Sequence, residues 1–134
     1  MRKLLSILFL VLCLGCLASC GDDNTKPTKI VVGMECAYAP FNWTETEKTD
    51  SNYPISNLGN GAYAEGYDVQ VAKIIAEELG LELEIKALAW DALIQNLNTG
   101  GIDMIIAGMS PTAERLETID FTESYYESTH VLLV

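Results

Sequence analysis

Short stretches of strand character alternate with longer stretches of helical periodicity over much of this chain. The apolar runs "KIVVGM" (29–34) and "IDMIIAG" (102–108) are typical of buried strands, and "LELEIKAL" (81–88) alternates apolar with polar residues as a half-buried strand does. Between them, "YDVQVAKIIAEELG" (67–80) and "WDALIQNLNTGG" (90–101) carry apolar residues at helical spacing. This order predicts an α/β fold with a mostly parallel sheet, helices on both faces and the carboxyl ends of the strands along one edge.

Local signals predict where the helices begin and end. Asp68 is placed to cap the first helix, and Gly80 is placed to end it. The second helix is expected to stop at Gly100 and Gly101.

Two other stretches have a different character. The polar residues from Asn42 to Ala62 predict a long surface loop, with 44–62 as an insertion that is either functional or without a role. Near the end, "TIDFTESYYESTHVLLV" (118–134) predicts a short strand, an aromatic loop and an apolar terminal strand.

The first twenty residues have the features of a secretory leader. Two basic residues precede an apolar run that is short for a membrane span, so residues 1–19 are predicted to be a signal peptide rather than a plain transmembrane anchor. The ending "LASC" resembles the lipobox of bacterial lipoproteins, in which cleavage falls before a lipid-carrying cysteine, here Cys20. A cut before Cys16 fits less well, because Cys13 would stand where that pattern has an aliphatic residue.

The segment after the cleavage site is expected to be a tethered acidic domain. Residues 20–29 are interpreted as the lipidated cysteine and a flexible linker, and residues 30–134 as the folded part. Without 1–19 the chain has six basic and nineteen acidic residues, a net charge of −13. Such a surface repels nucleic acid and anionic lipid, so attachment to the membrane must come from the lipid on Cys20.

Cysteine usage excludes a disulfide framework in the expected mature chain. Cys36 is then the one cysteine besides the lipidated position, so no internal disulfide can form. His130, far along the chain, is its only conceivable base, and Cys36 is therefore interpreted as a buried or half-buried thiol rather than a nucleophile.

Arg115 stands where a cation is mildly unfavourable, in the first turn of a predicted helix, at a cost of roughly 0.3–1 kcal/mol. Ser110 or Thr112 can cap that helix, and Pro111 suits its first turn. Free backbone N–H groups, two hydroxyls and the guanidinium would then converge on one spot, which favours a carboxylate. The alternative is a surface pair between Arg115 and a neighbouring acid: Glu114, Glu117 or Asp120.

Aromatic residues and one acid follow the other strand ends. Tyr38, Phe41, Trp43 and Trp90 are either core residues or the walls of a small-molecule pocket beside the anion site. Glu35 is either an acceptor for a cationic or amide group in that pocket or a solvated carboxylate.

A family resemblance covers nearly all of the chain from Lys29 to Val134, apart from the 44–62 loop. "YAPF", "GYDVQVAKIIAEELG", "AWDALIQNLNTGGIDMIIAGMSPTAER" and "IDFTESYY" resemble, in order and spacing, the polar amino acid-binding proteins of bacterial ABC importers, the extracellular solute-binding family 3. The resemblance implies a periplasmic-binding-protein-like fold of type II. In it, two α/β lobes joined by hinge strands close over a free amino acid and deliver it to a permease.

The resemblance also implies roles for the residues of the third strand end. Arg115 corresponds to the arginine that holds the α-carboxylate, with help from backbone N–H groups and hydroxyls at Ser110 and Thr112. Gly108 and Ser110 correspond to positions that accept hydrogen bonds from the α-ammonium group.

The other strand ends correspond to the walls around the side chain of the amino acid. Tyr38 and Trp90 fall on flanking positions, and Phe41 belongs to the same wall. Glu35 falls where the family places a residue that touches the far end of the ligand.

The chain departs from the family pattern in its length. It stops at "HVLLV", about where the family's first hinge crossing begins, so we expect only the N-terminal part of lobe 1, without the second lobe. The resemblance then implies half a site, with weak or no ligand binding and an exposed apolar face.

The resemblance implies a lipid-anchored receptor on the extracytoplasmic side of the cell membrane, without enzymatic activity, metal or cofactor. One alternative is a dehydratase of cyclic carboxylic acids on the same fold, for which Glu35 and His130 are the sole acid-base candidates. Another is the sensory domain of a receptor, which would need a membrane helix after the domain.

Overall fold

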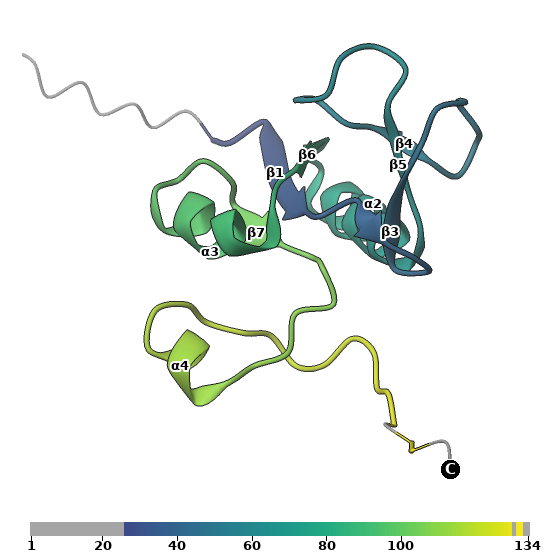
Figure 1. Ribbon diagram of the computed structural model, residues 1–134. Helices are drawn as coiled ribbons and strands as arrows, with labels where there is room; N and C mark the ends of the chain where they lie inside the picture. The colour runs from purple at the N-terminus through teal and green to yellow at the C-terminus, as the bar shows by residue number, and fades with distance from the viewer. Residues whose placement is uncertain (1–25, 130, 133–134) are drawn as a thin grey trace, which may run out of the picture.

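A three-stranded parallel sheet lies at the centre of the computed structural model, which describes residues 26–129, 131 and 132 (Figure 1). Strand β1 (Lys29–Met34) lies between β6 (Glu82–Ala87) and β7 (Met104–Ile105), in the order β6-β1-β7. Val32 of β1 pairs with Ile85 on one side and Met104 on the other. Five of the six residues of β1 are buried, as expected for a central strand.

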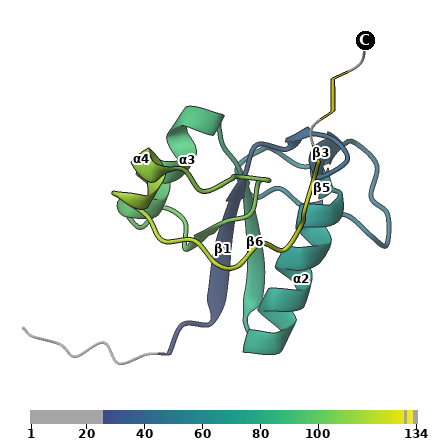
Figure 2. The same cartoon turned by 90° about the horizontal axis from the view of Figure 1, so that it is seen from below.

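Helices α2 (Tyr67–Leu79) and α3 (Trp90–Asn98) lie on opposite sides of this sheet, as two views agree (Figures 1 and 2). Gly33 of β1 lets α3 approach, because a β-carbon there would come within 2.5 Å of Ile102 and 3.2 Å of Leu93. The predicted α/β order with helices on both faces is therefore confirmed.

Of the two predictions for the ends of α2, the one for its C-terminus is confirmed and the one for its N-terminus is wrong. Gly80 adopts the left-handed conformation (φ 66°) and ends α2 as predicted. Asp68 is not a cap: Gly66 occupies that position without a side-chain hydrogen bond, and Asp68 is fully buried in the first turn. The prediction fails because Asp68 finds tertiary partners that local sequence does not show. Helix α3 ends at Asn98 with Thr99 as its C-cap, and the left-handed Gly100 (φ 74°) follows directly, so the predicted glycine stop is confirmed.

A second sheet occupies much of the region that was expected to be a loop. It is antiparallel, with the order β2 (Ala37–Tyr38), β3 (Asn42–Glu45), β5 (Tyr63–Glu65) and β4 (Tyr53–Pro54). Ile55, inside the predicted 44–62 loop, is only 3% exposed and bridges to Ile85 of β6. Strands of two to four residues are too short to produce an alternating pattern in the sequence.

The chain after β7 contains one short helix. The ladder of β7 continues slightly on both sides, since Asp103 N–H donates to Val31 O and Ile106 N–H to Gly33 O. Helix α4 (Ala113–Leu116) follows, and within the described residues no strand comes after it. In the view of Figure 2, the segment beyond α4 passes in front of β1 and β6 toward α2.

The predicted strands near the end are wrong where the structure describes them. Val131 and Leu132 lie outside any strand and are 75% and 92% exposed, so this apolar pair has no sheet edge to join. His130 lies outside the described residues, as do the predicted signal peptide and Cys20. Over residues 26–129, 131 and 132, no helix is long and apolar enough to cross a membrane.

Candidate functional site

A hollow of about 250 Å³ lies at the carboxyl edge of the parallel sheet. Its lining residues come from the three segments that follow the strands: Glu35 and Tyr38 after β1, Trp90 at the start of α3 after β6, and Ala107 and Gly108 after β7. This is where an open parallel sheet places its ligands. The structure therefore brings together four of the predicted site residues, which are up to 73 positions apart in the sequence.

The guanidinium of Arg115 lies over the Trp90 ring, with 5.3 Å between Cζ and the ring centroid, in cation–π geometry. Its Nη1 donates a 2.9 Å hydrogen bond to the backbone oxygen of Ser110. No carboxylate of the described residues comes within ion-pair distance, so the alternative pairing with Glu114, Glu117 or Asp120 is not found. The cation thus remains available beside the hollow.

The start of α4 holds Arg115 in place. Thr112 is the cap, and its Oγ1 accepts a 3.3 Å hydrogen bond from the Arg115 N–H. Ser110 contributes its backbone oxygen and does not cap the helix. The prediction that Pro111 lies in the first turn is wrong, because the cap falls one residue after it and Pro111 precedes the helix.

Close approach at Gly108 shapes the wall of the hollow. Gly108 has φ 61°, and a β-carbon there would lie 3.2 Å from the Tyr38 ring. A side chain at this position would therefore be strained and would push Tyr38 away. Phe41 stacks on Tyr38 with ring centroids 5.2 Å apart, but Phe41 is not among the lining residues and acts as a support behind Tyr38.

Two further predicted residues have clear positions. Glu35 is half-buried at the hollow, and its carboxylate has no hydrogen bond or ion pair with any described residue. Trp43 lies in β3 away from the hollow, where its indole N–H donates to Glu45.

A hydrogen-bond network centred on the buried Asp68 joins the wall of the hollow and was not predicted from the sequence. Asp68 Oδ1 accepts from the Tyr125 hydroxyl (2.9 Å) and Oδ2 accepts from Asn42 Nδ2 (2.7 Å). The Tyr125 oxygen in turn accepts from the Gly108 N–H (3.0 Å). Burial raises the pKa of Asp68, against the effect of its two hydrogen bonds, and burial raises the pKa of Tyr125 to about 12. No local signal in the sequence links these residues.

Cys36 is confirmed as a buried free thiol, 4% exposed. Burial raises its pKa to about 12, so the thiolate needed for nucleophilic chemistry does not form near neutral pH. Within the described part of the chain, no three side chains of the types His, Cys, Asp and Glu come together to hold a metal ion.

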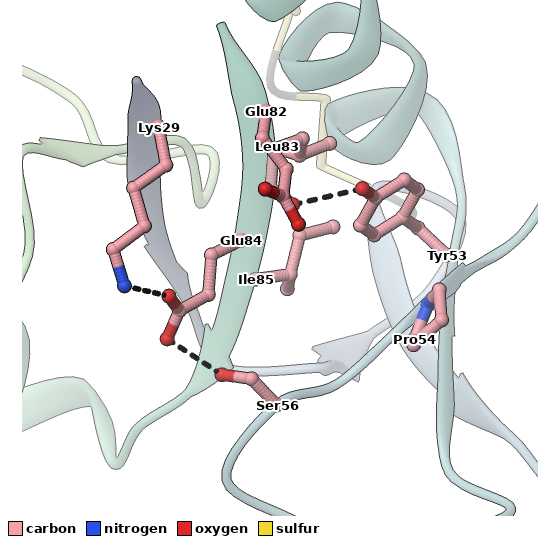
Figure 3. Close-up of a pocket in the computed structure, with 8 residues that line it drawn as sticks. All are labelled: Lys29, Tyr53, Pro54, Ser56, Glu82, Leu83, Glu84 and Ile85. Carbon is pink, nitrogen blue, oxygen red and sulfur yellow. Dashed lines mark hydrogen bonds and ion pairs between the residues drawn. The ribbon is translucent and has the colours of Figure 1, made fainter. Parts of the chain in front are cut away.

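A larger hollow, of about 370 Å³, lies along the edge of β6 away from the strand carboxyl ends (Figure 3). Two of its three charged residues form an ion pair: Lys29 Nζ lies 2.6 Å from Glu84, which also accepts from Ser56. The third, Glu82, has no partner among the described residues. The hydrogen bond between Lys29 and Glu84 raises the pKa of Lys29 and lowers the pKa of Glu84. Because the one cation that lines this hollow is already paired, the hollow at the carboxyl edge, beside the unpaired Arg115, is the better candidate site.

Comparison with known proteins places the chain in a recognised group. The family model described as bacterial extracellular solute-binding proteins, family 3, matches residues 30–134. The probable ABC transporter arginine-binding protein ArtJ of Chlamydia trachomatis is 34% identical over 99% of this chain and 48% of its own length. The chain spans about half the length of the curated relatives that it matches.

Solved structures agree with this grouping. Domain 1 from TmArgBP in its arginine-bound form matches with a TM-score of 0.60 and 34% identity, over 74% of this chain and 68% of that one. The ancestral cationic amino acid solute binding protein AncCDT-1, also described as a precursor of cyclohexadienyl dehydratase, matches with a TM-score of 0.60 and 32% identity, over 74% of this chain and 37% of that one. These matches confirm the predicted α/β lobe of the periplasmic-binding-protein-like, type II, class.

Proposed function

The chain belongs to the bacterial extracellular solute-binding proteins of family 3, and from this membership we propose that it captures a free amino acid for an ABC importer. Within that function we assign it a cationic amino acid such as arginine. In this proposal the described residues belong to the N-terminal part of lobe 1, and the ligand lies between the three segments that follow β1, β6 and β7.

The observation that carries this proposal is a pair of opposite charges at one hollow. Arg115, over Trp90, has no carboxylate partner among the described residues. Glu35 has no cationic partner among them. A cationic amino acid has a carboxylate at one end and a positive charge at the other, so it can satisfy both groups at once. Charge-assisted hydrogen bonds of this kind are about twice as strong as neutral ones.

The other site residues complete the proposed contacts. Ser110 and Thr112 would support Arg115 at the α-carboxylate, and Gly108 and Ser110 would accept from the α-ammonium group. The Ser110 carbonyl oxygen already accepts from Arg115, but its second lone pair leaves room for another donor. Tyr38 and Trp90 would flank the aliphatic part of the side chain, with Phe41 behind Tyr38.

Two relatives support the choice of ligand. ArtJ is named as an arginine-binding protein, and the TmArgBP structure is that of domain 1 alone in an arginine-bound form. By analogy, we propose that the lobe described here binds arginine by itself, which revises the expectation of weak or no binding. The lobe carries both Arg115 and Glu35, so it retains contacts for both ends of the ligand.

The anchoring part of the proposal rests on residues outside the described structure. We propose that Cys20 becomes the lipidated N-terminus after removal of residues 1–19, which holds the protein on the extracytoplasmic side of the membrane. The partner would be the permease of the importer. The acidic composition supports a lipid tether rather than electrostatic attachment.

We propose binding without turnover, although AncCDT-1 is described as the precursor of a dehydratase. General acid-base catalysis needs at least one group that exchanges a proton with the substrate, and the lining residues offer Glu35 for this role. In the proposed function that carboxylate is occupied by the cationic end of the ligand.

Calorimetric titration of the chain with arginine tests the proposal. We expect binding by the wild type, and an affinity about 30- to 100-fold weaker for Arg115→Ala, because a charge-assisted contact to the carboxylate is lost. Lys48→Ala, which removes an exposed cation elsewhere, is the matched control and should bind as the wild type does. Equal affinity in Arg115→Ala would remove the carboxylate assignment.

A further inference from the structure

A relay of hydrogen bonds connects two of the loops that form the hollow through one buried carboxylate. From β7, the Gly108 N–H donates to the Tyr125 oxygen, and the Tyr125 hydroxyl donates to Asp68. From β1, the Cys36 N–H donates to Asn42 Oδ1 (2.8 Å), and Asn42 Nδ2 donates to Asp68. Asp68 and Asn42 are both 0% exposed, whereas Tyr125 is 38% exposed, so the relay runs from the packed interior out to the wall of the hollow.

The proton positions in this relay are determined by chemistry. A phenol has one hydroxyl hydrogen, and Tyr125 uses it to donate a hydrogen bond to the carboxylate of Asp68. The Tyr125 oxygen is then free to accept from Gly108. Asp68 therefore determines which way the Tyr125 hydroxyl hydrogen points, and so leaves the Tyr125 oxygen as the acceptor for the Gly108 N–H.

Tyr125 is also held from its other side. Its ring stacks on Tyr67 at 6.2 Å with an interplanar angle of 15°, and its backbone oxygen accepts from the Tyr67 hydroxyl (3.1 Å). The segment after α4 passes in front of β1 and β6 and reaches α2 (Figure 2). The contacts with Tyr67 of α2 thus hold Tyr125 where its hydroxyl oxygen reaches the Gly108 N–H.

We infer that Tyr125 is a positioning residue, whose hydroxyl, oriented by Asp68, sets the backbone of Gly108 at the wall of the hollow. Gly108 needs such a restraint because it lacks a side chain and sits at φ 61°, against the Tyr38 ring. In a planar trans peptide, the direction of the Gly108 N–H also determines that of the Ala107 carbonyl. Both residues line the hollow, so one hydroxyl controls two backbone groups of the site.

The consequence for ligand affinity rests on the proposed function, whereas the restraint on Gly108 does not. Tyr125→Phe removes the hydroxyl and keeps the ring. Tyr126→Phe is the matched control, because Tyr126 is the next residue and its hydroxyl makes no hydrogen bond with the described residues; its ring contact with Phe41 is retained.

The first measurement is amide hydrogen exchange by NMR on the ligand-free chain. In the wild type we expect the Gly108 amide to be protected although the residue is exposed. In Tyr125→Phe its exchange should be about tenfold faster, the factor that corresponds to one hydrogen bond of ordinary strength. Amides within α2 should keep their rates, which separates a local effect from general destabilisation, and Tyr126→Phe should match the wild type.

The second measurement is the affinity for arginine, expected to be about tenfold weaker in Tyr125→Phe and unchanged in Tyr126→Phe. An unprotected Gly108 amide in the wild type, or a rate unaffected by Tyr125→Phe, would overturn the restraint. Faster exchange with unchanged affinity would overturn its role in binding. If the wild type binds no arginine, the proposed function fails, and the Gly108 amide still decides whether the restraint exists.

Discussion

Arg115 and Glu35 are the two residues at the hollow whose charges are not neutralised by the described part of the chain. An isolated charge in a half-buried position is unfavourable, and a ligand of complementary charge relieves that cost. Arg115 is kept in reach by Trp90 and by the Ser110 carbonyl, both of which hold the guanidinium without neutralising it.

The role of Glu35 can be tested with a pair of ligands that differ in one charge. Citrulline has nearly the shape of arginine but a neutral side chain, so the wild type should prefer arginine. In Glu35→Gln we expect this preference to fall by about tenfold or more, because a hydrogen bond between ionised groups becomes a neutral one. Calorimetry with both ligands on both proteins gives the coupling directly; an unchanged preference would mean that Glu35 does not face the cationic end.

Asp68 predicts a distinctive dependence of stability on pH. Burial raises its folded-state pKa above 3.8. The contribution of Asp68 to the free energy of unfolding is therefore complete below that pH and is lost as the pH rises through the folded pKa. The difference in unfolding free energy between wild type and Asp68→Asn should therefore decrease upward from about pH 4 and then level off. Urea denaturation at a series of pH values measures it.

Glu84 provides a control of opposite sign for the same series. Its hydrogen bond to Lys29 lowers its folded-state pKa below 4.5, so its contribution is present above that pH and is lost as the pH falls through the folded pKa. As the pH falls, the difference in unfolding free energy between the wild type and Glu84→Gln should thus decrease. The corresponding difference between the wild type and Asp68→Asn should increase. Parallel trends for the two variants would contradict the assignment of Asp68.

At the scale of elements, residues 53–57 cover the exposed edge of β6. Ile55 pairs with Ile85, the Ser56 N–H donates to the Ile85 oxygen, and the Tyr53 hydroxyl donates to the Leu83 oxygen (Figure 3). Asn57 mimics a neighbouring strand with its side chain: Nδ2 donates to the Ala87 oxygen and Oδ1 accepts from the Ala87 N–H. An uncovered edge strand would be prone to pair with other chains.

Removal of the Asn57 amide should loosen this edge. In Asn57→Ala we expect the Ala87 amide to exchange about fivefold to tenfold faster, since its hydrogen bond is lost to water. Ser56→Ala is the control, because the Ser56 hydroxyl contacts the Glu84 carboxylate and not the Ala87 backbone. If Ala87 exchange does not change in Asn57→Ala, the side chain does not protect the edge.

At the scale of the whole molecule, the net charge of −11 at neutral pH must oppose compactness. The described residues contain one ion pair, Lys29–Glu84, so most acidic groups repel one another without local compensation. This surplus is a property of the surface and not of the site.

Added salt should therefore stabilise the protein at neutral pH. Raising sodium chloride from low concentration to the physiological range screens the repulsion, and a gain of about 0.5 kcal/mol would raise Tm by roughly 2–4 °C. Near the sequence pI of about 4.3 the net charge is small, and the same salt step should leave Tm nearly unchanged. A loss of stability on salt addition at neutral pH would contradict this account.

The sequence by itself determined the order of β1, α2, β6, α3 and β7, because periodicity and buried runs are local properties. It also determined the edge at which Glu35, Tyr38, Trp90 and Gly108 meet, since parallel strands with crossover connections gather their carboxyl ends. Their detailed roles came from family resemblance and remain proposals.

The tertiary structure alone decided the features that depend on long-range partners. Asp68 looks like a helix cap in sequence but is the buried centre of a hydrogen-bond relay, because Asn42 and Tyr125 reach it from 26 and 57 positions away. Segment 53–57 looks like loop but covers β6, because its side chains find backbone groups about 30 positions away. Such contacts follow from how elements pack in space, and neither propensity nor periodicity encodes them.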